Sequence, residues 1–455
     1  MFLKPFLNNM SRLRAMAESD FLSVILLGII SVFYTGYVFI SNDLVFANGI
    51  RQLKDPLFLA NDITFDAHPR SILFFRLLSC LSDILPINIL FFIFYFIKNI
   101  LLCGGIYKLA YCLTKNRTAA FISIAAIFYT ANQKIPLSFD IVLNSFSFSS
   151  FAVAICFFAI AFFIEKRHFL CFIILGVGIN IHLIICSQVL AVLLIYYCLM
   201  NWREIRWKEI LPGLFICLCL ASPEIINVLS IALQEFKESS VSFKEYLEIF
   251  GYMRGPHHHF PEAWSFEKYL RFAAFSLAGI YAYLNLQKSR ESASGIWMCL
   301  IIVCLCVASI PFTHRFMPVL IYQPFRMTIW IYAIMLIFIC GFIAETLQSK
   351  TDKKSYLWAF GAMAFINSIF LLCVLFLLRV AHDWRLERKK IKLAFLILFA
   401  LLILIFLTLK HPQYPLFIFP ALSAMLRTPY QATDIYLLFL VVGMGVFGLF
   451  FKLRQ

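Results

Sequence analysis

The sequence predicts an all-α fold: a polytopic transmembrane helical bundle of about 12 to 14 spans, some of them short or re-entrant. Three observations lead to this prediction. Hydrophobic residues make up 62% of the 455 residues and charged residues only 14%, whereas an ordinary soluble domain is about 45–50% apolar and about 25% charged. The apolar residues form long unbroken runs, such as 21–41 and 393–409. Transmembrane β-barrels lack such runs.

The distribution of positive charge predicts the orientation of the chain. The formal net charge is +15, and Lys and Arg recur in short clusters at polar breaks, which the positive-inside rule marks as cytoplasmic. Both termini are then cytoplasmic, and the expected location is the cell (inner) membrane. Because the basic residues are spread over many loops rather than gathered on one face, we expect no nucleic-acid partner.

In the first half of the chain, an uncleaved signal-anchor span is expected at 21–41. The first outer loop, 42–86, should hold an interfacial helix at 71–86. Further spans are expected at 87–113, 118–131 and 148–164, with a second outer loop at 132–147. The run 169–200 has basic residues on both sides and is too long for one span. Two short helices folded back at Asn180–His182 would satisfy both observations.

In the second half, a span at 210–230 leads into the largest outer segment, 231–268. The remaining expected spans are 269–286, 295–311, 327–347, 393–409 and 432–451. Outer loops are expected at 312–326 and 410–431, and the topology of 357–379 stays open. No internal repeat is visible, so residues 1–455 are predicted to form a single transmembrane domain.

Acidic residues in the first outer loop are candidates for catalysis. A carboxylate at a membrane surface can act as a general base or a metal ligand, because partial desolvation and nearby cations tune its pKa. Asp62 could equally cap the following helix, and Asp55, which precedes Pro56, reads better as a turn former. The 14 cysteines lie in or beside apolar runs and form no CxxC pair, so they predict neither a zinc site nor a disulfide framework.

The segment 252–264 carries a second polar cluster, with Arg254, His257, His258, His259 and Trp264. Three adjacent histidines cannot all point one way, so a zinc site made by them alone is not expected. Two of them with a carboxylate from elsewhere could hold a divalent metal, although the sequence requires no cofactor. The preferred functional interpretation is a phosphate or sugar site, with Arg254 and one or two of the histidines on an anionic group. Tyr252, Phe260 or Trp264 would then stack on a sugar ring. An interfacial loop of the aromatic belt is the competing interpretation.

Three further residues are candidates for substrate binding. Arg326 and Arg427 lie at the outer edges of predicted spans, where an arginine can either snorkel or hold a lipid-linked phosphate. His182 is either a functional group within the membrane or a polar residue that fills the helix break, and the break is the better supported interpretation.

Several short motifs together resemble the C-type superfamily of polytopic membrane glycosyltransferases, nearest to an uncharacterised bacterial family with this fold. The matching pieces are Asp55-Pro-Leu-Phe-Leu-Ala-Asn-Asp62, His182 at the break, Arg254-Gly-Pro-His-His-His-Phe-Pro-Glu-Ala-Trp264, and Gln323-Pro-Phe-Arg326. The resemblance implies inverting transfer of a sugar from a polyprenyl-phosphate-linked donor to a glycan or lipid acceptor, on the extracytoplasmic face.

Carried over by position, the resemblance makes Asp62 the base, with Asp43 as its substitute. Arg254, Arg326 or Arg427 would hold the donor phosphate. Three alternatives stay open: an O-antigen-type polymerase or ligase with a lipid pyrophosphate donor, a non-catalytic membrane assembly protein, and a lipid or polysaccharide transporter. Transport is disfavoured because Lys98 is the only obvious charge in the middle of a run and no repeat is visible.

Overall fold

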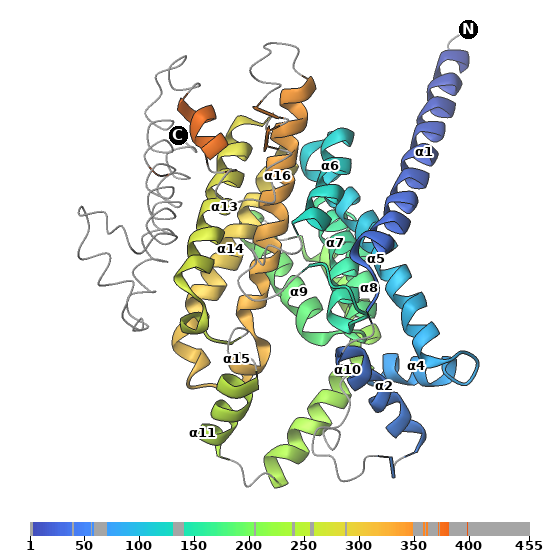
Figure 1. Ribbon diagram of the computed structural model, residues 1–455, viewed down its shortest axis with the longest axis vertical. Helices are drawn as coiled ribbons and strands as arrows, with labels where there is room; N and C mark the ends of the chain where they lie inside the picture. The colour runs from blue at the N-terminus through green and yellow to red at the C-terminus, as the bar shows by residue number, and fades with distance from the viewer. Residues whose placement is uncertain are drawn as a thin grey trace, which may run out of the picture. The chain divides into compact units, whose positions relative to one another are not determined.

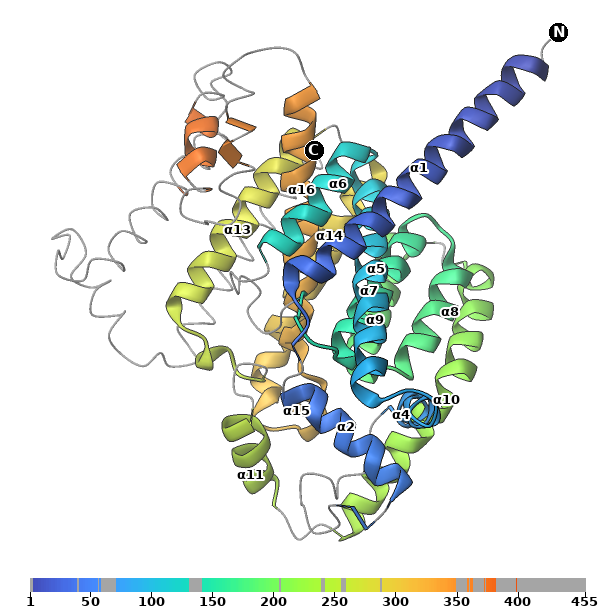
Figure 2. The ribbon, with the colours of Figure 1, turned by 45° about the vertical axis from the view of Figure 1, so that its right-hand side comes forward.

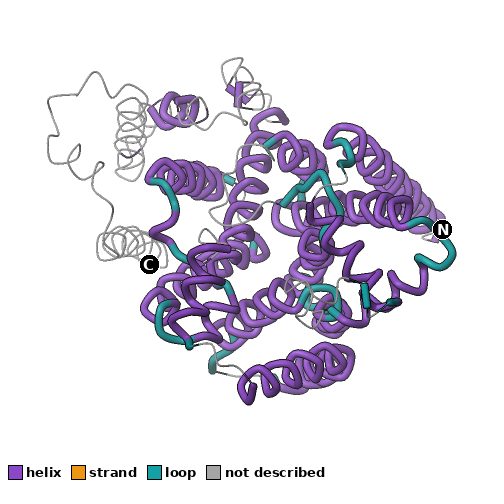
Figure 3. The backbone as a smooth tube through the Cα atoms, turned by 60° about the horizontal axis from the view of Figure 1, so that its bottom comes forward, coloured by secondary structure: helices purple, strands orange, loops and turns teal. Residues whose placement is uncertain are grey.

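The computed structural model describes residues 3–38, 41–55, 57–58, 71–130, 141–203, 206–238, 242–254, 259–286 and 289–348, with short stretches between 358 and 398. Within these residues every regular element is a helix (Figure 3). The all-α prediction is therefore confirmed for the described chain. The expected span 432–451 and the last outer loop, 410–431, lie outside the described residues, as does all of 393–409 except residue 398.

Among the described helices, five are long and apolar enough to cross a membrane: Ile87–Thr114, Leu183–Met200, Trp207–Ser230, Arg290–Thr313 and Met317–Gln348. Shorter apolar helices lie between them. This set indicates a membrane protein with several crossings. The expected total of about 12 to 14 spans and the direction of each crossing stay predictions.

The chain forms two compact units, which are described separately. Unit 1 comprises residues 1–128, 141–193 and 201–238, and unit 2 comprises residues 129–140, 194–200 and 239–455. The prediction of a single domain is left as a prediction.

Unit 1 is a series of neighbouring helices in which α1 packs on α5, α5 on α7, α7 on α8, and α8 on α10 (Figure 1). Its helices are α1 (Leu3–Thr35), α2 (Ser41–Lys54), α4 (Ile72–Leu81), α5 (Ile87–Thr114), α6 (Arg117–Tyr129), α7 (Phe148–Ile164), α8 (His168–Ile179), α10 (Trp207–Glu238) and the first part of α9 (Leu183–Met200). Glycines permit the closest approach: a Cβ on Gly176 of α8 would lie 2.9 Å from the carbonyl oxygen of Cys217 on α10. Small residues serve the same purpose in other membrane bundles.

The predicted break at Asn180–His182 is confirmed, because α8 ends at Ile179 and α9 begins at Leu183. Asn180 and His182, the polar residues at the break, each form hydrogen bonds with backbone groups. Asn180 Nδ2 donates to the carbonyl oxygens of Gly176 (3.0 Å) and Leu220 (2.8 Å). His182 Nδ1 accepts from the amide of Ile185 at 3.4 Å, as an N-cap does.

The segment between α1 and α5 contains α2 and α4, and α4 runs across the ends of the neighbouring helices of unit 1 rather than along them (Figure 1); Figure 2 shows it end-on. A separate short helix was predicted here, at 71–86, and the observed one ends earlier, at Leu81. One face of α4 buries Phe74, Phe75 and Leu78. Its location at a membrane surface remains a prediction.

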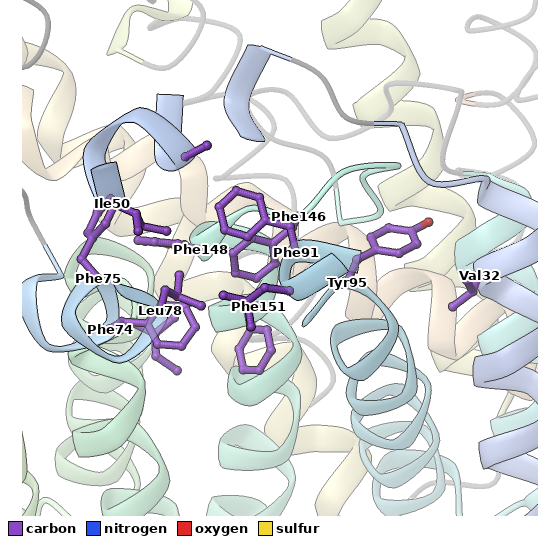
Figure 4. Close-up of a cluster of buried hydrophobic side chains, with 13 residues drawn as sticks. Val32, Ile50, Phe74, Phe75, Leu78, Phe91, Tyr95, Phe146, Phe148 and Phe151 are labelled. Carbon is purple, nitrogen blue, oxygen red and sulfur yellow. The ribbon is translucent and has the colours of Figure 1, made fainter. Parts of the chain in front are cut away.

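The buried face of α4 joins the aromatic core of unit 1 (Figure 4). Phe148 from the start of α7 stacks on Phe46 of α2 at 4.3 Å between ring centroids and meets Phe74 edge-on at 5.0 Å. Phe146 packs against Phe91 of α5 at 5.4 Å. Aromatic pairs in these geometries contribute about 0.5–1.5 kcal/mol each beyond area burial, so this cluster holds α2, α4, α5 and α7 together.

A buried carboxylate fixes the start of α4. Glu224, fully buried on α10, accepts from the amides of Ser71 (2.7 Å) and Ile72 (3.2 Å). Ser71, with φ 64°, also donates from its hydroxyl to the carbonyl oxygen of Ile181 at 2.7 Å. The unsatisfied amides and positive end of a helix N-terminus favour a carboxylate at this place. Ser71 thereby links three parts of unit 1: α4, the α8–α9 break and α10.

Two segments that the sequence predicts as outer have defined structure in unit 1, and their outer location stays a prediction. The polar segment predicted from residue 231 begins as helix, because α10 continues to Glu238. The second outer loop, predicted at 132–147, is largely buried in its described part, residues 141–147. There the fully buried Lys98 of α5 donates from Nζ to the carbonyl oxygen of Leu143 at 2.8 Å. A buried ammonium and a non-helical backbone satisfy each other, which lets this segment lie against α5.

Unit 2 contains α11 (Phe243–Tyr246), a π-helix η2 (Leu247–Arg254), η3 (Pro261–Ala263), α13 (Phe266–Asn285), α14 (Arg290–Thr313), α15 (Met317–Tyr322), η4 (Pro324–Met327) and α16 (Thr328–Gln348). The loop expected at 312–326 is mostly helical, since α15 and the first part of η4 occupy it. In α16 nearly every side chain is buried, against α13 and α14 among others.

Replacing Glu224 with Ala should destabilise the protein, because two buried amides of α4 lose their acceptor, at a cost of about 2–3 kcal/mol. The apparent melting temperature of the detergent-purified chain should fall by about 5–10 °C. Glu224→Gln, which keeps an acceptor, should lose less. The exposed Glu209 of the same helix supplies the control, and an equal loss for Glu209→Ala would contradict this role for Glu224.

Candidate functional site

Of the predicted site residues that the structure describes, four lie in unit 2, where two segments far apart in the sequence meet: Arg254, His259, Trp264 and Arg326. One segment runs from η2 to Trp264, and the other runs from His314 through α15 to η4. They touch where η2 contacts α15 and where His259 reaches the end of α15. The sequence motifs 254–264 and 323–326 are therefore neighbours in space.

His259 lies at the centre of this contact, with 2% of its surface exposed. Its Nδ1 is 2.9 Å from the carbonyl oxygen of Leu320, and its Nε2 is 3.3 Å from Nε2 of Gln323. A carbonyl oxygen can only accept, so Nδ1 carries the proton and Nε2 accepts from the Gln323 amide. Both nitrogens of the His259 imidazole therefore have partners within the protein.

Gln323 is held in a backbone conformation that its side chain does not favour. It ends α15 in the left-handed region, with φ 50° and ψ 59°, and is 6% exposed. Conformations of this kind persist when the surroundings determine them and occur often at functional sites. Here the turn aims the amide at His259 and starts η4, which carries Arg326 one helical turn later.

Beside His259, three rings pack against one another. Phe260 stacks on Tyr252 (4.4 Å between centroids) and on His314 (4.7 Å). Tyr252 and His314 also contact each other, with their centroids 6.3 Å apart and Tyr252 Oη 3.3 Å from His314 Nδ1. Phe260 is fully buried, whereas 47% of Tyr252 is exposed. Gly251 makes this packing possible, because a Cβ there would lie 2.8 Å from Cζ of Phe260. Tyr252 and Gly251 belong to η2, and π-helical turns are frequent at functional sites.

The rim of this cluster combines an aromatic ring, an imidazole and a cation. Arg315, next to His314, is exposed, and Arg326 is partly buried. An exposed tyrosine ring suits a sugar face, and a guanidinium suits a phosphate. We name this surface, made by Tyr252, His314 and Arg315, the unit 2 rim.

Trp264 lies inside the protein. It is 4% exposed, meets Phe325 edge-on at 5.3 Å between ring centroids, and packs beside Tyr269 at 5.5 Å. Its ring joins the start of α13 to η4. In this arrangement Trp264 supports the site from below, and Tyr252 is the ring that faces outward.

Several predicted site residues cannot be placed. Asp62, His257, His258 and Arg427 lie outside the described residues, and for Asp43 and Arg254 the structure describes only the backbone, in α2 and η2. Within the described part of the chain, no group of three or more His, Cys, Asp or Glu side chains could hold a metal ion. The metal and base assignments therefore stay predictions.

In unit 1, two residues take the structural roles that the sequence favoured for them. His182 caps α9, as described above. Asp55 Oδ1 accepts from the amide of Leu57 at 3.0 Å, which is an Asx turn, and this confirms Asp55 as a turn former. His182 and the unit 2 rim belong to separate units, so a common cavity for them stays a prediction.

Sequence reasoning missed the roles of Glu224 and Gln323. A carboxylate directly after a proline within an apolar run was a usable signal, since such a group must find a partner. Gln323 gave no comparable signal, because its backbone conformation depends on the packing of α15 against η2.

Gly251→Ala should disrupt this ring cluster, because the new methyl group meets a Phe260 ring that already packs against Tyr252 and His314. Overpacking of this kind costs about 1–3 kcal/mol. Limited proteolysis should show faster cleavage within 247–264, together with a lower melting temperature. Gly361→Ala is the matched control, since its Cβ would lie 3.4 Å from the nearest atom. Indistinguishable digests for the two variants would count against the close contact.

Comparisons of the chain with protein-family models, with curated proteins and with solved structures find no match. The resemblance to C-type glycosyltransferases thus stays a prediction from sequence motifs.

Proposed function

We propose that the protein is a membrane glycosyltransferase that moves a sugar from a polyprenyl-phosphate-linked donor to a glycan or lipid acceptor on the extracytoplasmic face. One observation carries the proposal: the motifs 254–264 and 323–326, separated by α13 and α14 in sequence, pack together around His259. The long apolar helices suit a membrane, which is where such a lipid-linked donor dissolves.

The unit 2 rim has the groups that a phosphosugar needs. Arg315 would pair with the donor phosphate, and Tyr252 would lie against the sugar ring. The His259–Gln323 pair would hold the two segments in place rather than react, because both nitrogens of the imidazole are already engaged. A fixed cation such as Arg315 would stabilise the negative charge of the phosphate as it leaves the sugar.

The resemblance assigns the role of base to Asp62, which lies between α2 and α4 in the sequence. The anchoring of α4 by Glu224 supports this assignment, since it fixes the start of the helix that follows Asp62 in the sequence. Asp62 would take the proton of the acceptor hydroxyl as the hydroxyl attacks the sugar carbon, and the polyprenyl phosphate would leave.

A lipid pyrophosphate donor, as in an O-antigen-type polymerase or ligase, is the second candidate. It is favoured by the presence of two arginines, Arg315 and Arg326, on the same segment as Gln323, because a pyrophosphate carries more negative charge than a monophosphate.

A binding experiment separates these candidates. Farnesyl phosphate should raise the melting temperature of the purified chain more than farnesyl diphosphate does, and farnesol should have little effect. Arg315→Gln should weaken the binding of farnesyl phosphate about tenfold, as expected for a lost charge-assisted hydrogen bond. Arg290→Gln, an exposed arginine at the other end of α14, should leave it unchanged. Stronger stabilisation by the diphosphate would favour the second candidate, and equal stabilisation by farnesol would contradict both.

Asp62→Asn should lower the release of polyprenyl phosphate about 10²-fold or more, because a general base contributes 10²–10⁴-fold. The assay uses proteoliposomes with a panel of labelled polyprenyl-phosphate hexoses and membrane-extracted acceptors. Asp55→Asn is the control, since Asn preserves an Asx turn. Unchanged turnover in Asp62→Asn would remove Asp62 from the mechanism.

A further inference from the structure

A basic pocket lies at the opposite end of α8 from the break at Asn180. The cavity has a volume of about 450 Å³ and is lined by Lys166, Arg167, His168, Phe169, Leu170 and Glu209. All six residues belong to unit 1. Five come from the turn between α7 and α8 and the first residues of α8, and Glu209 comes from the first turn of α10.

The turn that builds this pocket has a defined hydrogen-bond pattern. The amide of Lys166 donates to the carbonyl oxygen of Phe163 (2.9 Å), and the amide of Arg167 donates to that of Phe162 (2.8 Å). This pair of bonds is the Schellman motif that ends a helix, and Lys166 occupies its left-handed position, with φ 62°. Glycine adopts this conformation most readily. A lysine at this position adopts a less favourable backbone conformation than glycine would, which points to a use for its ammonium group.

The charges around the pocket are unequal. Glu165, the nearest acidic neighbour in the turn, pairs with Lys108 at 2.6 Å and reaches Arg167 only at 3.9 Å. Glu209 pairs with Arg206 at 3.4 Å. Each carboxylate thus has a cation from outside the pocket, and the exposed side chains of Lys166 and Arg167 leave the cavity net positive.

The pocket also continues into an apolar surface. Phe169 is 51% exposed and Leu170 37% exposed, on a helix whose other residues are strongly apolar. The two helices that carry the pocket, α8 and α10, pack closely, because a Cβ on Gly213 would lie 2.7 Å from the Phe172 ring. A phosphate in the pocket and an acyl chain along Phe169 and Leu170 would match both surfaces of one ligand.

We propose that this pocket binds the phosphate headgroup of an anionic phospholipid, with Lys166 and Arg167 as its cations and Phe169 and Leu170 against its acyl chain. Basic pockets between membrane helices are suited to such headgroups. The site is separate from the unit 2 rim and does not depend on the proposed transfer reaction.

The test is native mass spectrometry of the full-length chain in micelles that contain equal amounts of phosphatidylglycerol and phosphatidylcholine. The wild type should retain phosphatidylglycerol in preference. Lys166→Gly should lower the ratio of the two bound lipids about fivefold, and Lys166→Gly with Arg167→Gln about thirtyfold. Glu209→Gln should raise the ratio, because it removes the negative charge from the pocket.

Lys115→Gly is the matched control. Lys115 also occupies a left-handed position, with φ 53°, at the end of a helix, but it lies outside the pocket, so its variant should keep the wild-type ratio. Lys166→Gly should melt no lower than the wild type, since glycine suits its backbone. Should it melt lower, Arg167→Gln alone decides, with an expected loss of about fivefold.

Three results would overturn the proposal. The first is an equal fall in the lipid ratio for Lys115→Gly and Lys166→Gly, which would mean a general effect of surface charge. The second is a wild-type ratio in the double variant. The third is loss of the preference when millimolar glycerol phosphate is added, because the ligand would then be a free phosphate rather than a lipid.

Discussion

Within unit 1, the architecture depends on the hydrogen bonds that the Glu224 carboxylate accepts from two backbone amides at the start of α4. In an apolar surrounding an unsatisfied backbone amide costs several kcal/mol, and a buried carboxylate without partners costs more. Because the carboxylate and the two amides bond to each other, neither incurs this cost in free energy. Ser71 extends the contact to the carbonyl oxygen of Ile181, so the start of α4, the α8–α9 break and α10 are specified together. The aromatic cluster then packs on helices whose positions are already set.

The same requirement explains the irregular places along α10. Pro223 has no amide hydrogen, so the carbonyl oxygen of Cys219 loses its helical partner. The hydroxyl of Ser222 donates to that oxygen at 2.8 Å, and Asn180 donates to the neighbouring carbonyl oxygen of Leu220. Ser222 therefore satisfies the carbonyl oxygen that Pro223 leaves without a partner, and Asn180 joins the α8–α9 break to the next carbonyl oxygen of α10. Polar residues are scarce in this unit, and those beside irregular backbone form hydrogen bonds with its carbonyl and amide groups.

In unit 2, the buried polar groups find their partners in a different way. The His259 imidazole joins the carbonyl end of α15 to the Gln323 side chain, and the left-handed turn at Gln323 makes this contact possible. Below it, Trp264 and Phe325 fill the space between α13 and η4. Tyr252, His314 and Arg315 are left facing outward on a rigid base. A rigid base matters for either proposed donor, because a site that holds a phosphate must keep its cations in place before the ligand arrives.

The sequence by itself determined the helical class, several helix boundaries and the existence of the break. The helix at 148–164 begins and ends as predicted, because Ser147 caps its first turn and a basic turn follows it. The break at 180–182 followed from the length of an apolar run with basic flanks on both sides. These features are local, and hydrophobic period, caps and charge report them. Only the tertiary structure decided which distant polar groups meet. Glu224 lies 153 residues from Ser71, and His259 lies 64 residues from Gln323. Their pairing follows from how the helices pack, and no local pattern encodes the partner of a buried polar group. For the same reason the sequence could not choose among Tyr252, Phe260 and Trp264 as the ring that faces a ligand, whereas packing buries Phe260 and Trp264 and leaves Tyr252 exposed.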